Sequence, residues 1–75
     1  MNYGKALRLV RSSRNISQRE LSETINLDPS YISLIEKGKR VPTIETLEKI
    51  GKVLDIPLHL FFLLASDKDE VKKLL

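Results

Sequence analysis

Apolar residues recur along this chain at helical spacing, and no stretch alternates polar and apolar positions as a half-buried strand does. Four apolar side chains near the N-terminus share one helix face, at i, i+3, i+4 and i+7: Tyr3, Ala6, Leu7 and Val10. A later stripe also keeps to one helix face: Ile44, Leu47, Ile50 and Leu54. The pattern therefore predicts an all-α protein with amphipathic helices.

Capping signals in the middle of the chain mark two short helices. Ser17 and Glu20 have the spacing of a capping box, in which each side chain accepts a hydrogen bond from the other residue's backbone N–H. Asn26 tolerates the left-handed conformation that ends a helix. Asp28 is a good N-cap and Pro29 a good first helical residue. These signals predict helices over residues 18–25 and 29–37, the second ended by a left-handed glycine at position 38.

The connection between these two helices is residues 26–28, which is short enough to force a sharp turn, as a helix-turn-helix requires. Ser22 is small enough to let the helices approach, and Ile32 and Ile35 would hold the second helix on the core. Thr43 and Pro57 are start signals for two further helices. The expected architecture is a five-helix bundle in a single domain, residues 1–75, and we expect a close helix–helix approach at the glycine inside the fourth helix.

Composition removes several classes of function. The chain has no cysteine and one histidine, His59, so we expect no disulfide framework, no metal site and no Ser-His-Asp triad. We also expect no enzymatic activity and no cofactor. The longest apolar run, residues 60–65, is far below the roughly 20 residues that a membrane span needs. Without a hydrophobic signal region at the N-terminus, we expect a cytoplasmic protein.

The net charge of +3 is unevenly distributed along the chain. Residues 1–40 hold eight Lys or Arg against four acidic residues, whereas residues 41–75 hold five Lys against six acidic residues. This asymmetry indicates an anion-facing half and a nearly neutral half.

Residues 16–62 resemble the Cro/CI-type, xenobiotic-response-element-like family of helix-turn-helix regulators, and the first helix also fits. The run Tyr-Ile-Ser-x-Ile-Glu-x-Gly-x-Arg-x-Pro-Thr over residues 31–43 is a specific signature of that family. The resemblance implies a lambda-repressor-like fold that binds operator DNA as a homodimer and regulates transcription. A restriction–modification controller protein and a phage-type repressor are two candidate forms.

The family pattern and the outward face of the second short helix select ten candidate DNA-binding residues: Ser17, Gln18, Arg19, Ser30, Tyr31, Ser33, Leu34, Lys37, Lys39 and Arg40. Those on the second short helix would read bases and phosphates, and the three basic residues after position 36 would follow the DNA backbone. Since the base-reading positions offer few bidentate donors, the expected further sources of specificity are DNA shape, Tyr31 and Arg14, or the N-terminal arm. The resemblance also implies a structural ion pair between Arg11 and Glu36.

The helix predicted over residues 58–64 is apolar on all sides, which a surface helix with one buried stripe does not need. We therefore expect a homodimer interface here. Its candidate residues are Leu58, Leu60, Phe62, Leu63 and Leu74. A two-fold dimer would place two reading helices about one DNA turn apart, roughly 34 Å, on a pseudo-palindromic operator. In the alternative arrangement, the tail over residues 66–75 folds back on the helix of its own chain.

Two other functions stay open at this stage. An antitoxin would bind DNA and also grip a toxin through exposed apolar surface. A helical protein–protein adaptor would use the same fold without binding DNA, and its lack of salt-dependent duplex binding would identify it.

Overall fold

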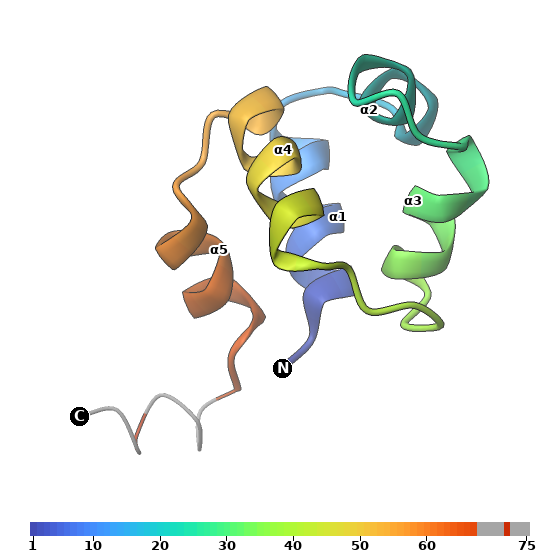
Figure 1. Ribbon diagram of the computed structural model, residues 1–75. Helices are drawn as coiled ribbons and strands as arrows, with labels where there is room; N and C mark the ends of the chain where they lie inside the picture. Colours follow the sequence, from blue (N-terminus) through green and yellow to red (C-terminus); the bar gives the residue numbers. More distant parts are fainter. Residues whose placement is uncertain (68–71, 73–75) are drawn as a thin grey trace.

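The computed structural model describes residues 1–67 and 72 (Figure 1). In this part of the chain, five helices follow one another: α1 (Tyr3–Ser13), α2 (Gln18–Thr24), α3 (Pro29–Glu36), α4 (Ile44–Leu54) and α5 (Leu58–Ala65). The all-α five-helix prediction is confirmed, and α2, α3 and α5 each end within one residue of the predicted boundary. The predicted interface residue Leu74 and most of the tail lie outside the described residues.

Side chains cap three of the four predicted helix starts, whereas the start of α5 at Pro57 has no side-chain cap. The Ser17 hydroxyl accepts the Glu20 N–H at 3.0 Å, and the Glu20 carboxylate accepts the Ser17 N–H at 3.3 Å, which completes the capping box. The Asp28 carboxylate accepts the Ser30 N–H at 2.8 Å, with a proline at the first position of α3. Thr43 caps α4 in the same way. Local sequence is therefore enough to start α2, α3 and α4 where they start.

In the part of the chain that the structure describes, a residue with left-handed backbone conformation follows each of four helices, α1 to α4. Asn26 (φ 59°) and Gly38 (φ 76°) are the two that the sequence predicted. Asn15 (φ 56°) and Asp55 (φ 55°) are two more, after α1 and α4, that it did not predict. Asn and Asp are the residues other than glycine that most readily adopt this conformation, so their types were the available signal.

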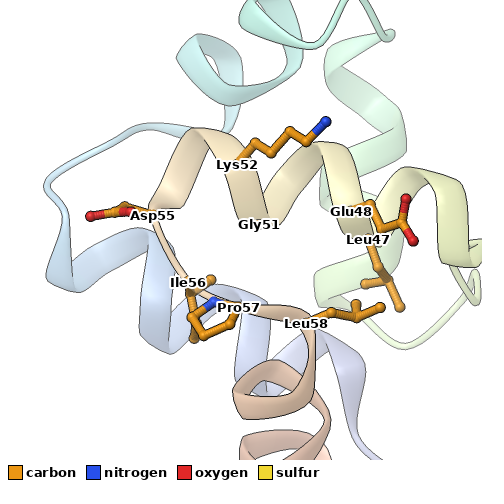
Figure 2. Close-up of a pocket in the computed structure, with 8 residues that line it drawn as sticks. All are labelled: Leu47, Glu48, Gly51, Lys52, Asp55, Ile56, Pro57 and Leu58. Atoms are coloured by element: carbon orange, nitrogen blue, oxygen red, sulfur yellow. The ribbon is translucent and has the colours of Figure 1, made fainter.

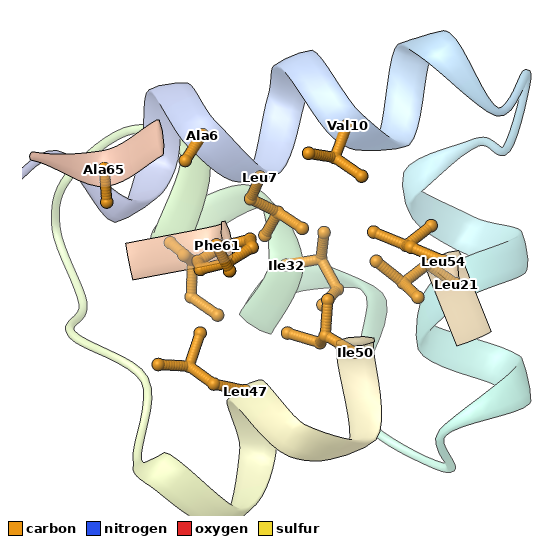
Figure 3. Close-up of a cluster of buried hydrophobic side chains, with 11 residues drawn as sticks. Ala6, Leu7, Val10, Leu21, Ile32, Leu47, Ile50, Leu54, Phe61 and Ala65 are labelled. Carbon is orange, nitrogen blue, oxygen red and sulfur yellow. The ribbon is translucent and has the colours of Figure 1, made fainter. Parts of the chain in front are cut away.

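The core is a contiguous cluster to which all five helices contribute (Figure 3). Its buried apolar members are Ala6, Leu7, Val10, Leu21, Ile32, Ile35, Leu47, Ile50, Leu54, Phe61 and Ala65. Ile44 was predicted to belong to this stripe, but that prediction is wrong because its side chain is 54% exposed. It is the first residue of α4, where the helix extends past the edge of the core.

Two glycines allow close backbone approaches. A Cβ on Gly4 would overlap the Ile35 carbonyl oxygen and lie 2.7 Å from that of Glu36, so α1 passes directly over the end of α3. A Cβ on Gly51 would lie 2.7 Å from the Ile56 carbonyl oxygen. The expected approach at Gly51 is therefore to the α4–α5 connection and not to another helix. The Ile56 N–H donates to the Gly51 carbonyl at 2.9 Å.

An open groove of about 440 Å³ lies beside this connection. Figure 2 shows the eight residues that line it: Leu47, Glu48, Gly51, Lys52, Asp55, Ile56, Pro57 and Leu58. Its apolar side chains come from α4 (Leu47), from the connection (Ile56 and Pro57) and from the start of α5 (Leu58), and Glu48 and Lys52 extend outward from α4. The groove belongs to α4 and α5 and lies apart from the α2–α3 pair.

Candidate nucleic-acid interface

The α2–α3 pair has the packing that a helix-turn-helix needs. Ser22 is fully buried, and its hydroxyl donates to the Arg19 carbonyl at 2.9 Å, so a small side chain occupies the contact between the helices. Ile32 and Ile35 are buried on the inner side of α3, with Leu21 of α2 in the same cluster. These contacts confirm the predicted inner face and leave the opposite face of α3 uncovered.

The outer face of α3 carries the side chains predicted to read DNA. Ser30 and Lys37 are exposed, whereas Tyr31, Ser33 and Leu34 are half-buried. Tyr31 packs partly against the core, although its position off the inner face predicted a fully outward side chain. The tyrosine side chain is therefore held in part by its own chain.

The Ser30 hydroxyl takes part in the cap of α3. It donates to the Asp28 carboxylate at 2.7 Å, beside the backbone N–H of Ser30, which donates to the same oxygen. The hydrogen bond from the Ser30 hydroxyl lowers the pKa of Asp28 most, and the bond from the Ser30 backbone N–H lowers it further. Burial raises this pKa by a smaller amount. In this conformation the Ser30 hydroxyl proton is already held by Asp28, so its oxygen can still accept a hydrogen bond but the hydroxyl cannot donate one.

Glu36 is the centre of a polar cluster that ties α1, α2 and α3 together. Arg11 donates to both carboxylate oxygens, with Nε at 2.7 Å and Nη2 at 3.0 Å, and this confirms the predicted ion pair. Its Nη1 donates to the Ile16 carbonyl at 2.8 Å, in the α1–α2 connection. Gln18 Nε2 donates to the same carboxylate at 3.2 Å, and Arg8 Nε at 3.4 Å. The carboxylate side chain is fully buried and has four donors.

Gln18 and Arg8 acquire their roles through this cluster. The Gln18 amide nitrogen has two hydrogens, so it can brace α3 with one and donate to a phosphate with the other. Arg8 was not among the predicted site residues. Its signal was its position three residues before Arg11, which puts both side chains on one helix face. Arg11 already pairs with the single carboxylate of this cluster. The additional charge of Arg8 therefore makes the net charge of the cluster positive.

The same cluster sets the pKa values of the ion pair. Burial raises the pKa of the Glu36 carboxyl. Hydrogen bonds from Arg11 and its other donors, together with the Arg11 charge, lower that pKa by more than burial raises it. The pKa of Glu36 therefore lies below its ordinary value. The hydrogen bond to Glu36 raises the pKa of Arg11, which keeps both groups charged at neutral pH.

We expect this depressed pKa to make the fold sensitive to acid. A carboxylate with a lower pKa in the folded state contributes stability above its unfolded pKa, about 4.3, and loses it as pH falls through the folded pKa. Urea unfolding between about pH 7 and pH 3 should show this loss in the unchanged protein. Glu36→Gln should have a flatter pH dependence over the same window, and equal slopes in the two proteins would contradict the assignment to Glu36.

Arg14, a predicted further source of DNA specificity, makes contacts within its own chain. Its Nε donates to the Leu54 carbonyl at 2.8 Å and its Nη2 to the Asp55 carbonyl at 3.4 Å, at the C-terminal end of α4. A cation here satisfies carbonyls that the helix leaves free and complements its dipole. Arg19 pairs with Glu23 at 2.9 Å across one exposed turn of α2.

The basic residues that follow α3 remain on the surface. Lys37, Lys39 and Arg40 are all exposed. The Arg40 guanidinium carbon lies 5.5 Å from the centroid of the Tyr31 ring, within cation–π range. The site thus combines a helix with an uncovered face and a cluster of cations at its end, which suits a negatively charged partner.

The apolar residues of α5 divide into an inner and an outer face. Leu58, Phe61, Phe62 and Ala65 pack toward the core, and the Phe62 ring meets Tyr3 edge to face with centroids 6.3 Å apart. Leu58 and Phe62, two of the predicted interface residues, are therefore half-buried in their own chain.

The outer face carries what we call the apolar patch: Leu60, Leu63 and Leu64 of α5, with Leu9 of α1. Their exposed fractions lie between 41% and 57%. Leu9 and Leu64 line one groove of about 430 Å³, which joins the two helices in one surface.

Other site types were also sought. Among residues 1–67 and 72, no group of three or more His, Asp or Glu side chains is placed to hold a metal ion. No helix in that part of the chain is long and apolar enough to cross a membrane.

Known proteins resemble this chain in sequence and in fold. A helix-turn-helix family model matches residues 5–61. The transcriptional regulator PuuR of Escherichia coli K12 is 40% identical over 67 residues, which is 89% of this chain and 36% of PuuR. The chain thus spans about a third of that relative.

Solved structures agree with this match. The clp gene regulator ClgR of Corynebacterium glutamicum superposes with a TM-score of 0.82 at 28% identity, over 85% of this chain and 68% of ClgR. The restriction–modification controller protein C.Esp1396I, solved as a tetramer with its natural operator, has a TM-score of 0.74 at 34% identity over 84% of each chain. The chain belongs to the helix-turn-helix family, among the Cro/CI-type transcriptional regulators.

Proposed function

We propose that this chain is a homodimeric transcriptional regulator that binds a pseudo-palindromic operator in double-stranded DNA, with α3 in the major groove. One observation carries the proposal. α3 is held from behind by Ile32 and Ile35 and at its end by the Glu36 cluster, while its outer face is uncovered. A helix fixed in this way can present side chains to base edges without first becoming ordered.

The candidate residues divide by the part of DNA that each would contact. Ser33, Leu34 and Tyr31, half-buried along the outer face of α3, would contact base edges, with Leu34 suited to a thymine methyl. Two further sets of candidates lie beside the outer face of α3. The first is at the start of α2 and α3: Ser17, Gln18 and Arg19 would donate to phosphates, whereas Ser30, whose donors are held by Asp28, would accept from a base donor. The second follows α3: Lys37, Lys39 and Arg40.

The apolar patch supports the dimer. Exposed apolar residues on adjacent helices mark interaction surfaces, and a two-fold contact would cover the same patch on both copies. We propose Leu60, Leu63 and Leu64 as its centre, with Leu58 and Phe62 supporting α5 from the inner side. Such a dimer would present two α3 helices to successive major grooves, roughly 34 Å apart.

The likeness to C.Esp1396I favours a restriction–modification controller protein as the form of this regulator, with a phage-type repressor as the other. We further propose that residues 1–75 act as a single DNA-binding unit in the cytoplasm, without a cofactor and without catalysis.

Selection from a pool of randomised duplexes at about 50 mM salt tests the proposal. We expect a recovered inverted repeat, and an affinity that falls steeply as salt rises because phosphate contacts release counterions. Failure to bind any duplex at this salt concentration, or an affinity independent of salt, would overturn it.

Two substitutions should separate base contacts from phosphate contacts. Lys39→Ala is expected to weaken binding equally on all sequences and to reduce the salt slope by about one unit. Ser33→Ala should instead change the order of preference among sequences, because we propose that its hydroxyl contacts base edges. Anisotropy titrations on the selected repeat and its single-base variants measure both effects. The same uniform loss from both variants would remove α3 as the reading helix.

The apolar patch also favours a second candidate, an antitoxin that binds DNA and grips a toxin. Light scattering on the isolated chain distinguishes the two. A dimer whose patch is covered supports the self-contained regulator, and a monomer that binds operator only with a second protein supports the antitoxin.

A further inference from the structure

Arg40 and Tyr31 form a contact that links the connection after α3 to the first turn of the same helix. The guanidinium carbon of Arg40 lies 5.5 Å from the Tyr31 ring centroid, although the two residues are nine positions apart. Both belong to the proposed DNA-binding surface. The contact therefore places the Arg40 guanidinium, from the connection after α3, beside the proposed DNA-binding face of α3.

Tyr31 is well suited to hold such a cation in place. Its ring packs partly against the core, so one part of the side chain is fixed by the protein. The tyrosine side chain also has only two rotatable bonds before its hydroxyl, which limits the ordering that the contact requires. The ring face is thus a rigid platform on an otherwise exposed surface.

Arg40 has the most to gain from that platform. It is exposed, and it lies in the α3–α4 connection and not in a helix. A free arginine side chain loses much of its rotamer freedom when it binds a partner, and part of that loss is avoided if the side chain is already ordered. The planar guanidinium stacks on an aromatic face, which the compact ammonium of a lysine does less well.

We propose that Tyr31 is a positioning residue for Arg40: the ring holds the guanidinium over the reading helix before DNA arrives. This inference rests on the proposed DNA-binding function and assigns different roles to Tyr31 and Arg40 within it. Tyr31 contributes to affinity through its ring face and through Arg40, and the phenolic hydroxyl is not required. Arg40 in turn depends on Tyr31, whereas the neighbouring Lys39 does not.

A double-mutant cycle on operator binding tests this coupling. In the unchanged protein, Tyr31→Leu should weaken binding, but in the Arg40→Ala background the same change should keep only the smaller effect of the ring's own DNA contact. The coupling should reach about fivefold, the strength of a cation–π contact at the upper end of the exposed range. Lys39→Ala provides the matched control, since its effect should add to that of Tyr31→Leu.

Conservative variants separate positioning from direct contact. Tyr31→Phe keeps the ring face and should retain both affinity and coupling. Arg40→Lys keeps the charge but should lose most of its dependence on the ring. Independent effects of Tyr31→Leu and Arg40→Ala would overturn the proposal, and so would an equal loss in Tyr31→Phe and Tyr31→Leu. If the unchanged protein binds no duplex, the proposed function fails instead.

A measurement without DNA keeps the proposal testable if a variant folds poorly or DNA binding is absent. Ring currents should shift the NMR resonances of the Arg40 side chain in the unchanged protein and in Tyr31→Phe. The shift should disappear in Tyr31→Leu, while the resonances of Ile32 and Ile35 report that α3 remains packed. Arg40 resonances at unstacked positions in the unchanged protein would overturn the contact itself.

Discussion

Glu36→Ala is expected to lower the free energy of unfolding by about 3 kcal/mol. The carboxylate side chain is fully buried, and its partner Arg11 is only 14% exposed. Removal of the carboxylate leaves a half-buried guanidinium without its counter-charge and Gln18 without its acceptor. A chain of this length has a total stability of only about 4–11 kcal/mol, so the loss is a large fraction of it.

Urea unfolding at neutral pH measures this loss, with Glu45→Ala as the matched control. Glu45 pairs with Lys49 at 3.6 Å on the exposed side of α4, and an exposed pair of this kind is worth less than about 0.5 kcal/mol. A similar small effect for both variants would show that the Glu36 cluster contributes little to stability. The cluster would then serve to orient α3 and not to hold it in the fold.

The difference between these two acidic residues shows what the sequence alone could predict. Signals that act within a few residues were sufficient, as in the Ser17–Glu20 capping box and the left-handed turn at Asn26. The Arg11–Glu36 pair spans 25 positions and was predicted only through the family resemblance. Long-range partners depend on how helices pack, and periodicity does not contain that information.

Arg14 and α5 illustrate the same limit. Arg14 reaches a carbonyl 40 positions away, so its role depends on where α4 ends relative to α1. In α5 every position is apolar except one, so hydrophobic pattern cannot define which side faces inward. Packing against Tyr3 turns Phe62 inward and leaves Leu63 outside. The candidate dimer surface therefore includes the predicted Leu60 and Leu63 but not the predicted Leu58 and Phe62, which face inward.

Leu63→Asp is expected to give a folded monomer whose operator affinity is lower by about 100-fold or more. Leu63 is 51% exposed at the centre of the apolar patch, so a charge there costs little in the isolated chain but would be buried without a partner in a dimer. A monomer contacts one half-site at a time and loses the gain from linking two contacts, which is typically about 10²–10⁴-fold.

Light scattering and anisotropy on the selected repeat measure the two halves of this expectation. Ile44→Asp introduces the same charge at an exposed apolar position of α4, outside the patch, and should remain dimeric. Phe62→Asp cannot serve as the test, because that ring packs against Tyr3 and the core, so loss of folding would imitate loss of the dimer. A Leu63→Asp protein that stays dimeric would exclude the patch as the interface, and the two α3 helices would then need another surface to bring them one DNA turn apart.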